Sequence, residues 1–396
     1  MYDGILRSWG IVPFQTPFLD ISSPLAAWDC ARQGWDVMLN NPCNPLHLAY
    51  NYSPFWLTAS GVPLGVRDTT AVGWVLDILF IASLSLLPPP RHFVELLLVL
   101  AASLSTIVVF ALERANADII MFLLALAAGL LAGRGPKGRM IGYGFVLLSA
   151  LLKYYPVMFF ITLFRERIAV FAAVALVVAA SAAAFWAVYH ADIVRGWANI
   201  PTGRYDTDLF AAKNLPALIG MMVESTAASL RGAPAVGQAV TVGLYAGLVG
   251  AALAITRRLL RLPELSAATA ELSGLERVLM VIGSAVIVGC FFAGQSIGYR
   301  GIFLLLVMPG LLTLSRSEAS SLRALCLATA MVIVFLMWGE CLRRALDGGF
   351  GFWLLRELGW WWSVSILLAL VLDFLRESSV LSGALRWRGR QPLQPQ

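Results

Sequence analysis

The sequence predicts an all-α integral membrane protein, a bundle of about eleven membrane-crossing helices. Its 396 residues are 59% hydrophobic and only 13% charged, whereas soluble domains are about 45–50% apolar and about 25% charged. A helix that crosses the hydrocarbon needs about 20 apolar residues and satisfies its own backbone hydrogen bonds, so apolar blocks of that length count as crossings. The composition therefore excludes a soluble globule, a disordered chain and a disulfide scaffold.

Eleven apolar blocks follow one another between residues 69 and 375. Around 140–164 and 301–315 the blocks are too short to cross alone, which predicts tilted or broken helices there. The predicted crossings are 69–87, 93–112, 117–133, 140–152, 156–164, 168–189, 235–256, 276–294, 301–315, 322–340 and 359–375.

Arginine and lysine set the predicted orientation, because they concentrate in short cytoplasmic loops near the ends of crossings. They fall on alternate connections, for example at 134–139, 165–167 and 257–261. These connections are therefore predicted to be cytoplasmic, whereas 1–68 and 190–234 are predicted to be extracytoplasmic. The alternative, a cytoplasmic segment 1–68, would reverse every side.

The segment 1–68 contains no apolar block long enough to cross and no signal-peptide pattern. An outer segment without a leading helix is difficult to translocate, so we expect that an initial helix is missing before residue 1. The predicted organisation is an outer segment 1–68, a helical module 69–189, an outer loop 190–234, a helical module 235–375 and a cytoplasmic tail 376–396.

Cys30 and Cys43 share the predicted outer segment, in a compartment where disulfides persist. A bridge between them would hold this segment over the membrane face, and the sequence leaves open whether it forms. Cys290 and Cys326 fall inside predicted crossings, where cysteine behaves as a small apolar side chain.

Polar residues gather at the predicted outer ends of three helical hairpins. Charged groups at this depth are costly unless they are paired or face water. Ion pairs that stabilise each hairpin would explain them, and so would the binding of an anionic group such as a lipid phosphate. Each cation alone can equally reach the headgroups. The residues are Glu113, Arg114, Asn116, Asp118, Lys153, Tyr299 and Arg300.

No motif for a metal, a nucleotide or an activated serine occurs in the sequence. The three histidines are scattered, and H-E-x-x-H, the P-loop, G-x-G-x-x-G and G-x-S-x-G are all absent. The basic residues lie in small groups between apolar blocks, which argues against nucleic acid as a partner. Carboxylates then remain for acid–base chemistry. No cofactor is expected, although the sequence leaves a divalent metal open.

Five short stretches, taken in order, resemble one known group of membrane enzymes. They are F-L-D at 18–20, G-W-D-V with N-P-C-N-P and N-Y-S-P-F-W-L at 34–57, E-R-A-N-A-D at 113–118, L-L-K-Y-Y-P at 151–156 and Y-R-G-I-F-L-L at 299–305. The layout resembles the GT-C superfamily of polytopic glycosyltransferases, most closely glycosyltransferase family 87 and its uncharacterised bacterial relatives. That superfamily has a seven-helix module with a large first outer loop, and six predicted crossings plus the missing leading helix would match it.

The resemblance implies an inverting glycosyltransferase of the bacterial inner membrane. It would move a hexosyl or pentosyl group from a polyprenyl-phosphate donor to the hydroxyl of an extracytoplasmic lipid or glycan. Asp20 of F-L-D would be the general base, with Asp36 and Asp29 as fallbacks. The hairpin residues above would line the site, with Lys153, Tyr299 and Arg300 near the donor phosphate.

Two other classes of function stay open. A membrane transporter or lipid flippase would show ionisable residues near the middle of crossings and related halves in the sequence. Asp77 and Glu95 lie within or near the start of crossings, but no repeat is visible. A membrane acyltransferase would be expected to show a histidine-based site, and a structural subunit of an envelope-building complex needs no site at all.

Overall fold

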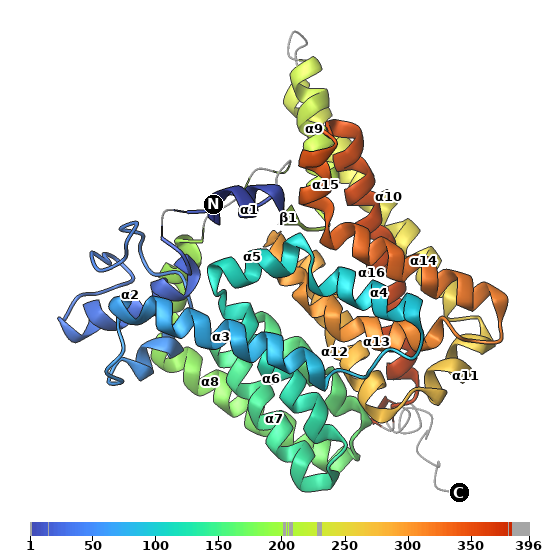
Figure 1. Cartoon of the computed structure of the whole chain (residues 1–396), viewed down its shortest axis with the longest axis horizontal. Coiled ribbons are helices and arrows are strands. Elements are labelled where there is room, and N and C mark those ends of the chain that lie inside the picture. Colours follow the sequence, from blue (N-terminus) through green and yellow to red (C-terminus); the bar gives the residue numbers. More distant parts are fainter. Residues whose placement is uncertain are drawn as a thin grey trace, which may run out of the picture.

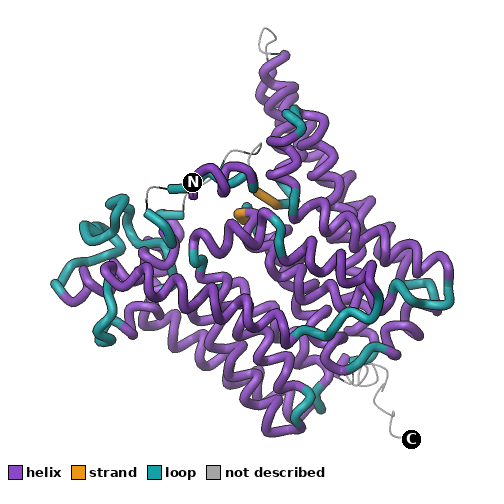
Figure 2. Tube along the Cα trace, in the orientation of Figure 1, coloured by secondary structure: helices purple, strands orange, loops and turns teal. Residues whose placement is uncertain are grey.

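The computed structural model is a bundle of helices with a layer of short helices and turns on one flank (Figure 1, Figure 2). Within the described part of the chain, the only sheet is a pairing of two very short strands. Most of the predicted tail 376–396 lies outside the described residues. The structure describes residues 2–14, 16–200, 203, 205, 209–227, 232–378, 380 and 381.

The amino-terminal layer is held together by buried aromatic residues. The indole N–H of Trp28 donates to the Trp56 carbonyl at 2.7 Å, and the indole N–H of Trp56 donates to the Leu152 carbonyl at 3.0 Å. The layer is thereby fastened to the helical bundle. Its elements are α1 (Tyr2–Ser8), α2 (Leu19–Arg32), η1 (Pro54–Ala59) and η2 (Val66–Asp68).

Each apolar block predicted between 69 and 189 lies in helical structure, with one interruption that the sequence did not predict. The block 93–112 breaks near Ser105, whose hydroxyl accepts from the Val108 N–H at 3.5 Å and caps a new helix. The elements are α3 (Thr69–Ser83), η3 (Leu84–Leu86), α4 (Phe93–Ser103), α5 (Thr106–Arg114), α6 (Ala117–Ala132), α7 (Gly135–Leu152), η4 (Tyr155–Arg165) and α8 (Ile168–Ala198).

The second half of the chain adds longer helices and the two strands, which pair antiparallel as Leu209 with Ile297 and Phe210 with Ser296. The elements are β1 (Leu209–Phe210), α9 (Asn214–Thr226), α10 (Ala233–Leu259), α11 (Pro263–Glu271), α12 (Gly274–Ala293), β2 (Ser296–Ile297), η5 (Gly298–Phe303), α13 (Leu304–Leu314), α14 (Ser320–Met337), α15 (Gly339–Ala345) and α16 (Phe350–Arg376).

Two helices extend furthest beyond the predicted apolar blocks. The block 168–189 continues as α8 to Ala198, and the block 359–375 is preceded by helix from Phe350. Polar side chains end the apolar signal without ending a helix, because most of them have acceptable helix propensities. The buried pair Arg356 and Glu357, 3.5 Å apart, lies in such an extension.

Seven helices within the described residues are long and apolar enough to cross a membrane, by length and composition. Three shorter apolar helices accompany them, namely Ala117–Ala132, Tyr155–Arg165 and Gly298–Leu314. The fold is therefore that of an all-α membrane protein. The seven are Val66–Leu86, Phe93–Arg114, Ile168–Ala198, Ala233–Leu259, Gly274–Ala293, Ser320–Met337 and Phe350–Arg376.

The main core lies between α12, α13 and α16, where residues such as Leu279, Leu306 and Leu367 are fully buried. Helix α8 is the opposite case, since Leu176 and Val188 on it are 71% and 69% exposed. An apolar helix with so much open surface is expected where lipid tails cover it.

Candidate functional site

Three turns that connect helices meet at one end of the bundle and bring charged side chains together. The turns are those between α5 and α6, between α7 and η4, and between α12 and η5. The amino-terminal layer covers the same place, because buried residues of α2 and the turn residues Ala115 and Ala117 belong to one apolar cluster.

The turn between α5 and α6 is tight and fixed by its own residues. Ala115 adopts a left-handed conformation with φ of 41°, which costs an alanine about 1–2 kcal/mol. Asn116 follows as the N-cap of α6, and its Oδ1 accepts from the Asp118 N–H at 2.8 Å. This cap places Asp118 in the first helical turn, where a carboxylate is favoured by the helix dipole.

Asp118 is the fully buried centre of a charged cluster. Its carboxylate accepts from the Lys153 ammonium and from the Tyr155 hydroxyl, the latter at 2.8 Å. Nε of Arg300 lies 3.4 Å from the other carboxylate oxygen. Two cations from distant parts of the sequence are thus held by one carboxylate, with an aromatic hydroxyl completing its contacts.

Asp20 reaches this cluster from the first turn of α2. Phe18, the preceding N-cap, donates its N–H to the Glu113 carbonyl at 2.9 Å, which ties the start of α2 to the end of α5. The Phe18 ring fits against Gly73 of α3, where an added Cβ would lie 2.4 Å from the ring. The start of α2 is therefore fixed on two sides, and Asp20 is held in place.

The Asp20 carboxylate contacts two groups of the α5–α6 turn. Its Oδ2 accepts a short hydrogen bond from the Asn116 amide, and its Oδ1 lies 3.9 Å from a guanidinium nitrogen of Arg114. The Tyr52 hydroxyl donates to the Asp20 carbonyl at 3.3 Å. Since Lys153 donates to Oδ1 of Asn116 at 3.2 Å, the amide connects Asp20 to the Asp118 cluster.

Arg114 is held by an acidic neighbour and by aromatic faces. Its Nε lies 2.9 Å from the Glu113 carboxylate, and its guanidinium sits 3.9 Å from the centre of the Phe14 ring and 5.1 Å from that of Phe110. Cation–π contacts of this kind stabilise a desolvated arginine. Arg114 thus stands beside Asp20, paired with Glu113 and covered by aromatic rings.

Tyr299 and Arg300 enter from η5. The Tyr299 ring packs on Phe110 at 5.5 Å between centroids, and the Arg300 guanidinium lies 4.4 Å above the Tyr155 ring. Nη1 of Arg300 donates to the Ser296 hydroxyl at 2.8 Å. Because Ser296 belongs to β2, the short strand pairing also positions this arginine.

Burial shifts the pKa values of the groups of the cluster that lie outside the apolar helices. It raises the pKa of the Asp20 carboxyl above its usual 3.8, against the opposing effects of the Asn116 hydrogen bond and the Arg114 and Lys153 charges. It lowers the pKa of the Lys153 ammonium below its usual 10.5, and the neighbouring Asp118 opposes this. Asp20 is therefore easier to protonate, and Lys153 easier to deprotonate, than in water.

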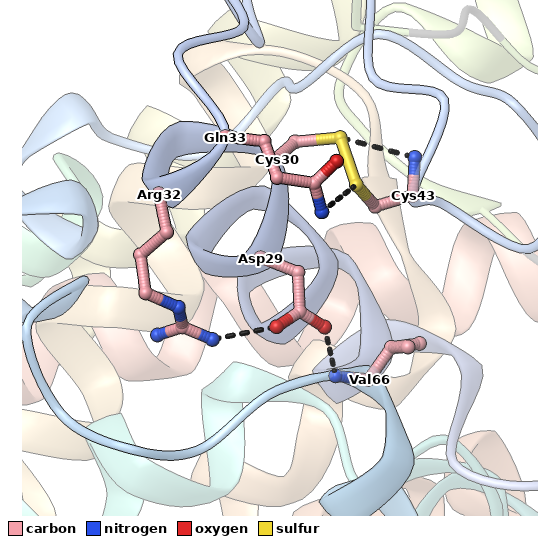
Figure 3. The surroundings of a disulfide bond; sticks show 6 residues. All are labelled: Asp29, Cys30, Arg32, Gln33, Cys43 and Val66. Carbon is pink, nitrogen blue, oxygen red and sulfur yellow. Dashed lines mark hydrogen bonds and ion pairs between the residues drawn. A yellow bond between two sulfur atoms is a disulfide. The ribbon is translucent and has the colours of Figure 1, made fainter.

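The fallback carboxylates lie outside the cluster. Asp29 pairs with Arg32 at 2.5 Å and accepts from the Val66 N–H at 2.7 Å, which joins α2 to η2 (Figure 3). Asp36 is half-exposed and lies 3.2 Å from Arg195 of α8. Of the three candidate bases, the structure brings only Asp20 to the other predicted site residues.

Cys30 and Cys43 form a disulfide at the far end of α2 (Figure 3). The bond joins α2 to the turns that follow it, and the Gln33 amide approaches the Cys43 sulfur at 3.8 Å. It therefore restrains the amino-terminal layer at the end of α2 opposite to Asp20.

Two aromatic hydroxyls of the cluster were not singled out from the sequence. Tyr155 contacts both Asp118 and Arg300, and Tyr52 contacts Asp20 and lies 5.6 Å from Lys153. Both belong to stretches with a visible signal, K-Y-Y-P and N-Y-S-P, but tyrosines at a membrane surface are also expected simply as interfacial residues.

No group of three or more metal-binding side chains occurs within the described ranges of the chain. The chain matches no protein-family model, no curated protein and no solved structure. What the site does must therefore be inferred from its own geometry.

Proposed function

We propose that the protein is an inverting glycosyltransferase that transfers a sugar from a polyprenyl-phosphate donor to the hydroxyl of an extracytoplasmic lipid or glycan. One observation carries the proposal. A carboxylate with a raised pKa, Asp20, lies beside Arg114 and is linked through Asn116 to Lys153, which shares the Asp118 carboxylate with Arg300. The three cations come from three separate turns at the ends of apolar helices. Such a place gives a lipid-linked phosphate both charge and access from the membrane.

The cations keep donor capacity for a ligand. The Lys153 ammonium has three donors, of which Asn116 and Asp118 use two. The Arg300 guanidinium has five donors, of which Asp118, Ser296 and the Cys290 sulfur use three. Their side chains are 13% and 21% exposed, whereas Asp118 is 0% exposed. Asp118 therefore holds the two cations from the buried side, and the exposed parts of Lys153 and Arg300 would contact the phosphate.

The proposed reaction needs one base and one stabilised leaving group. Asp20 takes the proton of the acceptor hydroxyl as its oxygen forms a bond to the anomeric carbon of the sugar. The bond between that carbon and the phosphate oxygen breaks, and its electron pair leaves with the polyprenyl phosphate. Lys153, Arg300 and Arg114 stabilise this departing charge. Attack opposite to the leaving group inverts the anomeric configuration.

The distribution of arginine supports the side assigned to the site. The ends of α6, α7, η4 and α12 opposite to the cluster carry Arg134, Arg139, Arg165 and Arg277. Since basic residues concentrate in cytoplasmic loops, the cluster would face outwards in a bacterial inner membrane. With the cluster on the outer side, the apolar helices would form a GT-C-like bundle of about eleven crossings, and the chain would end in a cytoplasmic tail.

The proposal is tested with the whole chain in lipid nanodiscs and synthetic polyprenyl-phosphate sugars. We expect release of polyprenyl phosphate and transfer of sugar to an alcohol acceptor with inverted configuration, and no transfer from nucleotide sugars. If no lipid-linked hexose or pentose is consumed with any membrane or glycan acceptor, the proposal fails.

One residue favours a lipid flippase or transporter as a second candidate. Asp77 is buried in α3, within one of the seven long apolar helices, and its Oδ1 has no hydrogen-bond partner among the described residues. Intramembrane carboxylates of this kind mark transport pathways. Movement of a labelled lipid across sealed vesicles, lost in Asp77→Asn and retained in Asp20→Asn, would select this function.

The pH dependence of transfer follows from the two shifted groups. Asp20 works as its carboxylate, so kcat/KM is expected to fall about tenfold per pH unit below its folded pKa, which lies above 3.8. Lys153 works as its ammonium, so a second decline is expected above a pKa lower than 10.5. Initial rates across the pH range check this. A rate that stays constant on acidification to 3.8 would contradict the assignment of Asp20.

A further inference from the structure

A cavity of about 330 Å³ lies between α6, α7, η4 and α12, at the opposite end of these helices from the Asp118 cluster. On α6 the cluster lies at Asp118 and the lining of the cavity begins at Ala128. At 1.5 Å per residue this separation is about 15 Å. The cavity is therefore a separate place in the molecule, which the proposed transfer reaction does not use.

The mouth of the cavity is polar and carries more arginine than acid. Nε of Arg139 lies 2.6 Å from the Glu166 carboxylate, which also accepts from the Tyr143 hydroxyl at 3.2 Å. Arg165 is exposed and lies 5.2 Å from the centre of the Phe374 ring. Of the two arginines that line the cavity, Arg139 is thus paired with Glu166, and Arg165 is the second.

Positive side chains outnumber negative ones around the mouth. Arg277 of α12 and Glu377 form an ion pair at 2.6 Å, and both act electrostatically on Arg165 with opposite signs. Arg134 lies exposed in the turn before α7, and Lys137 lies exposed in the first turn of that helix. A cluster of this kind, placed where helices end, attracts anionic headgroups.

The interior of the cavity is aliphatic. Its walls include Ala128 of α6, Val146 of α7, and Val278 and Ile282 of α12. A free phosphate would gain nothing from these walls, whereas the glycerol and first methylenes of a phospholipid would bury apolar surface at about 25 cal/mol per Å². The combination of a basic mouth and an aliphatic interior therefore selects an amphiphile.

We propose that this cavity binds an anionic phospholipid, with the phosphate between Arg139 and Arg165 and the glycerol and upper acyl chain against Val146, Val278 and Ile282. The bound lipid would bridge the α6–α7 hairpin and η4. It would stabilise the bundle at the end opposite to the transfer site. The proposal does not depend on the reaction that the protein catalyses.

The test uses the full chain and compares Arg165→Gln with Arg167→Gln. Arg167 lies two positions away and is exposed, but it does not line the cavity. The protein is exchanged from phosphatidylglycerol into detergent, and the retained lipid is counted by native mass spectrometry. We expect Arg165→Gln to weaken retention about tenfold, the value of one charge-assisted hydrogen bond, and Arg167→Gln to retain lipid as the wild type does.

Further experiments distinguish the binding of a phospholipid from the binding of free phosphate and from misfolding. Phosphatidylcholine is expected to exchange freely, and inorganic phosphate at equal concentration is expected neither to displace phosphatidylglycerol nor to raise the unfolding temperature. Arg165→Lys should restore part of the retention, which separates a loss of charge from misfolding. Equal retention by Arg165→Gln and Arg167→Gln would overturn the proposal, as would full displacement by inorganic phosphate.

Discussion

Replacement of Asp20 by asparagine is expected to lower the rate of sugar transfer by about 10²–10⁴-fold. Asparagine has nearly the same shape, and its carbonyl oxygen still accepts from the Asn116 amide as the Asp20 carboxylate does. It cannot take a proton from an acceptor hydroxyl, so the chemical step fails while the donor still binds. Single-turnover transfer at saturating donor measures the effect, together with a direct measurement of donor binding.

The matched control is Asp36→Asn in the same segment. Asp36 has a side chain that is 49% exposed and contacts Arg195, away from the Asp118 cluster. We expect its rate to equal that of the wild type, since removing one exposed carboxylate changes little. If Asp20→Asn keeps the wild-type rate, Asp20 is not the base. If both variants lose rate equally, the loss reflects the charge of the segment and not proton transfer.

The helices were largely predictable because hydropathy reports a property of each residue by itself. A continuous apolar block such as 276–294 needs no knowledge of its neighbours, and α12 occupies nearly this range. The break at Ser105 was not visible, because a serine inside an apolar block also occurs in unbroken helices. The extension of α8 to Ala198 was missed because the apolar signal ends before the helix does.

The candidate site was predictable only in part. The charge pattern placed Arg114, Lys153 and Arg300 on one side of the membrane, and the structure brings all three to one end of the bundle. Which acid holds which cation depends on how three hairpins pack against one another, and sequence spacing does not contain that information. From the sequence, Glu113 and Asp118 are therefore equal candidates for pairing with a cation. In the structure only Asp118 contacts two cations from other turns.

Replacement of Asp118 by asparagine is expected to destabilise the protein by about 3–5 kcal/mol, the cost of leaving buried charges without their partner. The carboxylate is fully buried and holds both Lys153 and Arg300. With asparagine, Lys153 and Arg300 lose their negative partner while they stay shielded from water. The free-energy cost of their desolvation is then no longer offset. Thermal unfolding in one detergent, followed by tryptophan fluorescence, measures the change.

Two companion variants decide whether the loss comes from unpaired charge. The double variant Asp118→Asn with Lys153→Met removes one stranded cation, so it should be more stable than Asp118→Asn alone, a non-additivity expected of residues in one network. Asp29→Asn removes a carboxylate from the part-exposed pair with Arg32 and should cost about 1 kcal/mol or less. If Asp118→Asn unfolds at the same temperature as Asp29→Asn, Asp118 does not hold the cluster together. In that case Lys153 and Arg300 must be compensated by other groups, and the three turns meet for reasons of apolar packing alone.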